Sequence, residues 1–244
     1  MHTSYTVIIT TFNRNLLLQR ALKSVLDQSL QPKEIIIINN YNKEIKKKLK
    51  SKKVKYYNLV KNFGSANGRN IGASLAKGKF LAYLDDDDFW HKDYLKISDI
   101  YLKKNLPDIL ISKKILFDKK GFKIFKKFEK LSIDDCFIKN PGIIGSNIII
   151  KKKSLLRING FDQNLIPSED KSLIIDAYYN KQKIILQDNF IFYNNDNTKK
   201  LTYDYKKRKI GKINFYLKYR KYMDLKSKLL NYKDIIVSVI KSYM

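Results

Sequence analysis

The chain has 244 residues, enough to bury a sizeable core, and 44% of them are hydrophobic, which excludes a disordered protein. Fifty Lys and Arg residues against 23 Asp and Glu give a formal net charge of +27, which favours polyanionic partners such as nucleic acid, an anionic membrane or phosphorylated substrates. The charge is spread in single residues and short runs, so a general bias towards lysine on solvated faces is an alternative explanation.

The single cysteine, Cys136, excludes a disulfide framework or a zinc cluster within one chain and fits a reducing compartment. The first residues lack a basic flank followed by an apolar core, and no apolar run approaches the roughly 20 residues that span a bilayer. We therefore expect a cytoplasmic protein, or one that is peripheral on the inner face of the cytoplasmic membrane.

The first ninety residues alternate between strand-like and helix-like segments. Runs of β-branched and apolar residues predict buried strands over 5–10 and 34–40, and further strands are predicted over 54–59 and 80–84. Apolar residues at helical spacing predict a helix from 17 to near 31–32, capped by Asn13, and a short helix over 68–76. A basic helical connector is expected over 43–53. The βαβαβαβ order predicts an α/β protein with a parallel, doubly wound sheet.

The second half of the chain is less regular. We expect helices over 91–104 and from Glu169 through Asn180, the latter capped by Ser168. Strands are expected over 109–111, 145–150 and 184–193, with a hairpin formed by 115–117 and 122–125.

The C-terminal tail carries an apolar stripe at helical spacing from Leu225 to Tyr243, with Lys226, Lys228 and Lys233 beside it. Such a helix either lies in a membrane interface or packs on the rest of the protein, and both interpretations remain open. We divide the chain into a domain over 1–200, with a donor half of about 1–90 and an acceptor half of about 91–200, and a basic amphipathic helical tail over 201–244.

Four consecutive carboxylates, Asp85 to Asp88, follow the strand over 80–84 and precede Phe89 and Trp90. Close like charges repel by about 1 kcal/mol per pair in water, whereas a hard divalent cation reverses the sign of the interaction. Ligands of open α/β sheets bind beyond the carboxyl ends of strands, which is where these acids lie. The pattern indicates a metal site, with a solvated acidic turn as the alternative.

Three features together resemble the pattern of glycosyltransferase family 2, over roughly residues 5–197: the first strand ending in Thr-Thr-Phe-Asn-Arg, the four aspartates, and the later pair Glu169-Asp170. The segments Asn62-x-Gly64, Gly68-Arg69-Asn70-x-Gly72 and Gly78 resemble the family's N-x-G…A-R-N-x-G…G element. Gly160-Phe161-Asp162 is similar to its G-F-D turn.

The resemblance implies the GT-A fold, a mixed and mainly parallel sheet between helices. It implies transfer of a sugar, with inversion, from a nucleoside diphosphate sugar (a UDP-sugar above all) to a hydroxyl of a cell-envelope glycan or lipid-linked acceptor. It also implies Mn²⁺ or Mg²⁺ held by Asp85 and Asp87, which would offset the charge of the leaving diphosphate. The implied nucleotide contacts are Thr10, Thr11, Asn13, Asn39, Arg69, Asp85 and Asp86. The residues implied at the acceptor side or behind the site are Asp88, Trp90, Gly145, Ser146 and Glu169.

In the family the Asp of the E-D pair is the general base, and Asp170 matches it. The attacking hydroxyl must lose its proton on the side opposite the leaving group, so a single base implies one displacement and hence inversion. The first turn of a helix would keep this carboxylate ionised, and the alternative is that both acids only complement the helix dipole. Arg69 would contact the donor phosphates or, as an alternative, form a salt bridge to one of the acids.

Two positions depart from the family pattern. Asn39 and Asn40 stand where two aspartates are usual, and an amide oxygen accepts the uracil N–H bond without charge assistance. No histidine follows the last strand, where Asp196 is the one potential ligand, and His91 fits a surface position at a helix start. Two other classes of function therefore stay open: a non-catalytic nucleotide-binding protein, and a basic nucleic-acid-binding protein with 17 tyrosines, although four clustered aspartates would repel a phosphate backbone.

Overall fold

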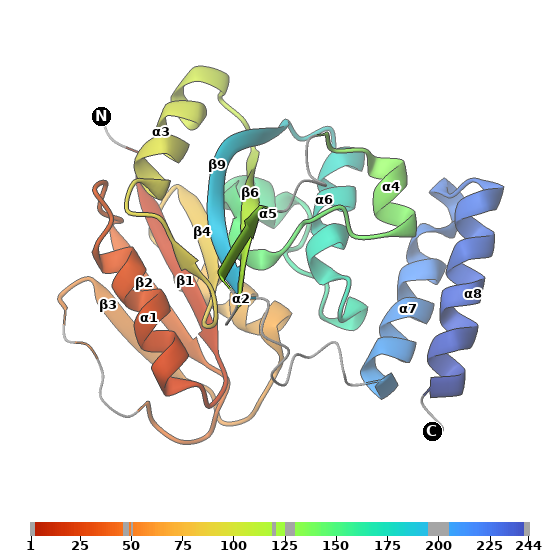
Figure 1. Ribbon diagram of the computed structural model, residues 1–244, viewed down its shortest axis with the longest axis horizontal. Helices are drawn as coiled ribbons and strands as arrows, with labels where there is room; N and C mark the ends of the chain where they lie inside the picture. The colour runs from red at the N-terminus through yellow and green to blue at the C-terminus, as the bar shows by residue number, and fades with distance from the viewer. Residues whose placement is uncertain are drawn as a thin grey trace.

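The computed structural model describes residues 3–45, 49, 51–118, 121–124, 130–194 and 205–241. Its centre is a mixed nine-stranded sheet in the order β3-β2-β1-β4-β8-β6-β9-β5, with β7 paired to β6 (Figure 1). The parallel strands predicted for the first half are β1 (Tyr5–Thr11), β2 (Glu34–Asn39), β3 (Val54–Asn58) and β4 (Phe80–Asp85). The second half adds β5 (Phe89–Trp90), β6 (Ile109–Asp118), β7 (Gly121–Ile124), β8 (Ile148–Lys151) and β9 (Ile184–Asn194).

Helices cover both faces of the sheet, which is why its first strands are apolar without alternation. On one face, α1 (Asn15–Leu26) and α3 (Tyr94–Asn105) pack over side chains such as Val7 and Ile35. On the other face, α2 (Ser65–Leu75) and α6 (Glu169–Tyr179) pack over Ile8 and Ile36. Successive side chains along each strand therefore point into two separate hydrophobic cores, one on each face of the sheet.

The remaining elements complete the acceptor half and the tail. They are the helices α4 (Ile133–Ile138) and α5 (Lys152–Arg157), the 3₁₀ turns η1 (Gly145–Asn147), η2 (Gln163–Leu165) and η4 (Arg220–Tyr222), and the tail helices α7 (Tyr205–Tyr219) and α8 (Leu225–Lys241). The two tail helices lie side by side at the edge of the molecule next to α4 and α6 (Figure 1). Phe215 and Tyr219 of α7 are buried in the core beside α6.

Four local predictions are wrong. The described residues within 43–53 form no helix, in keeping with a run of lysines that would repel one another at helical spacing. Arg14, and not Asn13, occupies the position before α1, and Asn13 itself has a left-handed φ of 52°. The same helix ends at Leu26, where the side-chain amide of Gln31 donates to the Leu26 carbonyl oxygen at 2.8 Å. Ser168 precedes α6 but makes no capping bond with its side chain.

Two predicted strands differ in length from the observed ones. β6 extends to Asp118, because its second part continues to pair with β9 after a register shift at Ser112/Lys113. The strand expected over 145–150 begins only at Ile148, since the three residues before it form η1. Both changes concern the half of the chain in which sequence periodicity is weak. No helix within the described ranges is both long and apolar enough to cross a bilayer.

Candidate active site

The site forms where the carboxyl ends of β1 and β4 meet the N-terminal ends of α2 and α6. The two strands are parallel neighbours, and their register places Thr10 opposite Asp85. Glu169 and Asp170 open α6, and the side chain of Arg69 reaches from α2 to Asp85 and to Asp170. The tertiary structure thus gathers at one place acidic and basic residues that the sequence distributes over a hundred positions.

The four aspartates divide into two outward and two inward side chains. Those of Asp85 and Asp87 are 29% and 19% exposed, whereas Asp86 and Asp88 are buried. Asp86 accepts a hydrogen bond of 2.6 Å from the Thr11 hydroxyl, and burial raises the pKa of its carboxyl to about 7. Asp88 accepts the backbone N–H of Asn194 at 2.9 Å, and burial and the charge of Asp87 raise its pKa.

Arg14 neutralises part of this acidic loop and was assigned no role from the sequence. Its Nη1 lies 3.1 Å from Oδ2 of Asp87 and 3.3 Å from Oδ1 of Asp86. The side chain of Arg20, which lies within α1, donates to the Asp87 carbonyl oxygen. The signal in the sequence is a lone arginine directly after the first strand, at the same sheet edge as the acids.

Arg69 is the central cation of the site. Its side chain is 4% exposed and lies 2.8 Å from Asp85, 2.9 Å from Asp170 and 3.9 Å from Glu169. Burial opposes the charge of the guanidinium, but the charges of these three carboxylates together raise the pKa of Arg69 above its ordinary value. The salt bridge that the sequence left as an alternative role for Arg69 is therefore present.

The family-like motifs position this arginine. Asn70 donates to the Phe161 carbonyl oxygen at 2.8 Å and accepts the Phe161 N–H at 2.9 Å, so the two motifs bind each other. The Phe161 ring lies 5.2 Å from the Arg69 guanidinium carbon, within the range of a cation–π contact. A Cβ added to Gly145 would lie 2.3 Å from Nη2 of Arg69, so only glycine leaves room for the guanidinium.

The surroundings of Asp170 raise the pKa of its carboxyl towards neutral pH. Its side chain is 17% exposed. Burial raises the pKa of Asp170 to about 7, and the charges of Glu169 and Asp85 add to that effect, while Arg69 and the Gly145 N–H oppose it. Burial, which the sequence did not reveal, is the largest of these influences on the pKa of Asp170. A pKa near the working pH suits a general base.

Glu169 is buried and supports the same cluster from the neighbouring position. It accepts a bond of 3.1 Å from the hydroxyl of Ser65, the first residue of α2. Its Oε2 atom has no hydrogen-bond partner among the described residues. Glu169 therefore ties α6 to α2 behind the site.

The residues expected around the nucleotide base lie at the carboxyl ends of β1 and β2. Thr10 and Thr11 are buried, and Asn13 is exposed. Asn39 donates its amide protons to the Lys43 carbonyl oxygen at 2.8 Å and to Asn58 Oδ1 at 3.0 Å.

Asn40 is a better candidate than Asn39 for a ligand contact. It is buried, and its Oδ1 atom has no partner within the described part of the chain. A Cβ added to Gly68 would lie 2.8 Å from Nδ2 of Asn40, so the glycine in α2 lets this amide sit against the helix. The neighbouring Phe12 is 46% exposed and meets the Tyr41 ring edge-on at 5.3 Å, which offers an aromatic surface that the sequence did not suggest.

Trp90 and Ser146 form the support of the acidic loop. The Ser146 hydroxyl accepts the Asp85 N–H at 2.9 Å, and its carbonyl oxygen accepts Nε1–H of Trp90 at 3.4 Å. Trp90 is buried and stacks on Tyr94, so it contacts no acceptor directly. His91 lies at the surface before α3, as the sequence predicts. Asp196, the potential ligand after the last strand, lies outside the described residues.

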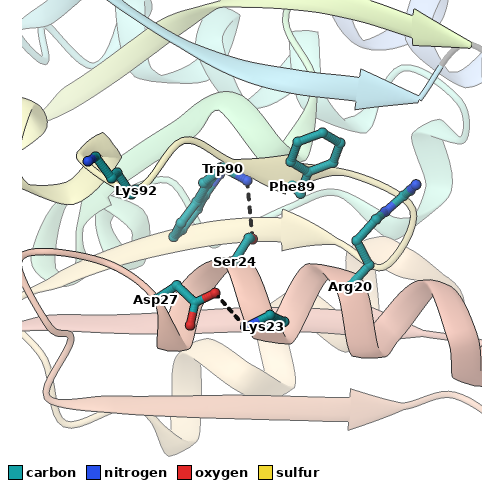
Figure 2. Close-up of a pocket in the computed structure, with 7 residues that line it drawn as sticks. All are labelled: Arg20, Lys23, Ser24, Asp27, Phe89, Trp90 and Lys92. Carbon is teal, nitrogen blue, oxygen red and sulfur yellow. Dashed lines mark hydrogen bonds and ion pairs between the residues drawn. The ribbon is translucent and has the colours of Figure 1, made fainter.

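A hollow of about 290 Å³ lies on the far side of the acidic loop, between α1 and β5 (Figure 2). In Figure 2 the Ser24 hydroxyl accepts the Trp90 N–H at 3.2 Å, and Lys23 pairs with Asp27 at 2.9 Å. The Ser24–Trp90 bond fixes α1 to β5, the strand that follows the aspartates, whereas the Lys23–Asp27 pair lies at the C-terminal end of α1. The hollow contains none of the carboxylates that face Arg69.

The exposed pair of aspartates fits a hard divalent cation. Asp85 and Asp87 offer two carboxylates, and Mg²⁺ takes one or two of these and completes its shell with phosphate oxygens and water. Among the described residues no group of three His, Cys, Asp or Glu side chains is arranged to hold a metal alone. A cation at Asp85 and Asp87 would complete its coordination with phosphate oxygens of the donor and with water.

The mixed sheet with helices on both faces is the GT-A fold. The family model described as glycosyl transferase family 2 matches residues 6–158, and the chain belongs to this family. The chain is 30% identical to the poly(ribitol-phosphate) beta-N-acetylglucosaminyltransferase TarP of Staphylococcus aureus over 201 residues, 77% of this chain and 61% of that protein. It is 27% identical to the GalNAc(5)-diNAcBac-PP-undecaprenol beta-1,3-glucosyltransferase of Campylobacter jejuni over 205 residues, 75% of this chain and 65% of that protein.

The same fold occurs in a solved structure. Residues 1–349 of S. aureus TarS in complex with UDP-GlcNAc superpose with a TM-score of 0.66 at 17% identity, over 86% of this chain and 66% of that chain. This similarity shows the fold. The chain spans less than two-thirds of the length of either of the two relatives named above.

Proposed function

We propose that this protein transfers a sugar, with inversion, from a UDP-sugar to a hydroxyl of a cell-envelope or lipid-linked glycan, with Mn²⁺ or Mg²⁺ bound. One observation carries the proposal: the buried guanidinium of Arg69 bonds both Asp85 at the end of β4 and Asp170 at the start of α6. A donor-side carboxylate and a candidate base thus lie within the reach of one side chain. Both carboxylates could therefore act on one bound donor, and such prior positioning lowers the entropic cost of the reaction.

On the donor side, Asp85 and Asp87 would hold the cation, which supplies positive charge for the diphosphate as it leaves. Arg14 and Arg69 are the cations nearest to these two carboxylates in the described structure, and a guanidinium suits phosphate geometry. The Oδ1 atom of Asn40 is the candidate acceptor for the uracil N–H. The UDP-GlcNAc bound to TarS supports a uridine donor for a chain with the same fold.

On the acceptor side, Asp170 accepts the proton of the attacking hydroxyl. The oxygen then forms its bond to the anomeric carbon while the bond from that carbon to the diphosphate oxygen breaks, and the electron pair leaves with UDP. A carboxyl with a pKa of about 7 is largely ionised at slightly alkaline pH and still basic enough to take the proton. One such base serves one displacement, which inverts the configuration.

The nature of the acceptor is supported by charge. One relative is named for a poly(ribitol-phosphate) acceptor and the other for an undecaprenol acceptor linked through a diphosphate, and both acceptors are anionic. The net charge of +27 on this chain favours an anionic acceptor in the same way.

The test is a thermal-shift screen of nucleotide sugars with and without MnCl₂, followed by a transfer assay with the ligands that bind. We expect UDP-sugars to raise the Tm only when Mn²⁺ is present, because a ligand that binds the folded chain stabilises it by mass action. Binding without hydrolysis or transfer would instead indicate a non-catalytic nucleotide-binding protein. No shift with any nucleotide sugar, together with salt-dependent binding of single strands, would favour nucleic acid.

A further inference from the structure

The outermost helix, α8, is attached to the protein by its polar side. Asn231 donates to the Phe137 carbonyl oxygen of α4 at 3.0 Å. Lys212 of α7 lies 3.0 Å from Oδ2 of Asp234 and donates to its carbonyl oxygen at 3.1 Å. Ser227 and Ser238 are 2% and 4% exposed. Small and polar side chains thus form the packed face of the helix.

The apolar side of α8 faces solvent. Leu229 and Ile236 are 61% and 57% exposed. The same face carries other exposed large hydrophobic residues: Leu225, Leu230, Tyr232, Val237 and Ile240. A surface helix normally turns its apolar stripe towards the core, so this orientation is the reverse of the usual one. Of the two interpretations open from the sequence, packing on the protein holds for one edge of the stripe only, where the centre of the Tyr232 ring lies 4.8 Å from that of Tyr216 in α7, whereas most of the stripe faces solvent.

The exposed face carries positive charge. At 100° per residue, Lys226 and Lys233 project between Ile240 and Val237, and both lysines are exposed. Residues 205–241 contain twelve Lys and Arg against two Asp. A second copy of the chain docked through this face would bring these like charges together, whereas an anionic surface would pair with them.

We propose that α8 docks this protein on an anionic lipid surface. The helix would lie in the plane of the interface, with the exposed apolar residues at the boundary of headgroups and acyl chains and with Lys226 and Lys233 at the lipid phosphates. About 17 residues at 1.5 Å per residue give the helix a length of about 25 Å along the surface. The proposal does not depend on the reaction that the chain catalyses.

The experiment is flotation of the full chain with vesicles of phosphatidylcholine alone and of equal parts phosphatidylcholine and phosphatidylglycerol. We expect binding to the anionic vesicles and weak binding to the neutral ones. The double variant Leu229→Gln/Ile236→Gln should weaken binding to the anionic vesicles by about tenfold or more, since it removes two apolar side chains from the interface. Lys226→Gln/Lys233→Gln should weaken it by a similar factor, because each surface lysine contributes to the attraction.

The matched control is Leu156→Gln on α5, whose leucine is also 61% exposed. It should bind vesicles like the wild type. All replaced side chains are exposed, so an unchanged Tm verifies the fold of each variant, and transfer to a soluble acceptor should be unchanged as well. This last measurement separates a failure of membrane docking from a failure of the proposed enzymatic function.

Three results would overturn the proposal. The first is that the wild-type chain binds neither kind of vesicle. The second is equal binding by the wild type and Leu229→Gln/Ile236→Gln. The third is a wild-type dimer in sedimentation that the same double variant converts to a monomer, since a second copy would then be the occupant of this face.

Discussion

Arg69 donates a hydrogen bond of 2.9 Å to Asp170, across 101 positions of the sequence. The same guanidinium donates to Asp85 at 2.8 Å, so one buried cation joins the end of β4 to the first turn of α6. Arg69, which neutralises Asp85, therefore also holds the candidate base Asp170 in position. The attraction between Arg69 and these carboxylates offsets the free-energy cost of burying their charges.

Replacement of Arg69 by Met should destabilise the protein by about 3–5 kcal/mol, because it leaves buried carboxylates without their partner. Urea unfolding monitored by circular dichroism measures this change. Arg157→Met on α5 removes an exposed arginine and should change the free energy of unfolding little. A loss at Arg69 no larger than at Arg157 would show that the carboxylates do not depend on this cation.

The division of the four aspartates predicts opposite results at neighbouring positions. Asp87→Asn should abolish the Mn²⁺-dependent rise in Tm caused by a UDP-sugar, because the exposed carboxylates are the candidate ligands. Asp86→Asn should retain that rise, since its side chain is buried and bonded to Thr11. Equal losses in both variants would contradict the assignment of inward and outward carboxylates.

Asp170→Asn should leave donor binding intact and lower the transfer rate by about 10² to 10⁴, the usual contribution of a general base. The thermal shift with donor and Mn²⁺ measures the first quantity, and initial rates with acceptor measure the second. Asp188→Asn alters a carboxylate that is 79% exposed and should affect neither. Near-normal turnover in Asp170→Asn would remove this residue from the base role.

Lys171, next to the candidate base, predicts a pH dependence of stability. Burial lowers the pKa of its ammonium from 10.5 to about 8, and its Nζ lies 4.0 Å from the centre of the Phe215 ring. Between these two pKa values the unfolded chain binds more protons than the folded chain, so this group adds stability as the pH rises, by at most about 1.4 kcal/mol per pH unit. Below pH 8 both states are protonated, and the penalty of the buried charge is fully present.

We therefore expect Lys171→Met to be more stable than the wild type at pH 7 and to lose that advantage between pH 8 and 10. Urea unfolding at pH 7.0 and 9.5 measures the difference between the two proteins. Burial raises the pKa of Cys136 to about 12, which lowers stability in the same range, while the charge of Lys171 lowers that pKa; both proteins are therefore compared with Cys136→Ala in place. Lys153→Met, an exposed position, should show no such trend.

The sequence by itself determined the elements whose signals are local. Apolar runs predicted the four parallel strands, the aspartates after Leu84 marked the end of β4, and the pair Glu169-Asp170 marked the start of a helix. Adjacent residues carry each of these signals, so no knowledge of distant contacts was needed. The described residues of the connector expected over 43–53 form no helix, because like charges outweigh helical spacing there, although Ile45 and Leu49 pack against the core.

Only the tertiary structure decided which of four consecutive aspartates face outward, since that depends on Thr11, Arg14 and Asn194. It likewise decided that burial raises the pKa of Asp170 and that the apolar stripe of α8 faces solvent. Burial and hydrogen-bond pairing depend on residues that are distant in the sequence and close in the folded structure. A stretch of sequence specifies the side chains of an element, but the elements packed against it determine which side chains remain exposed and which carboxyl retains its proton.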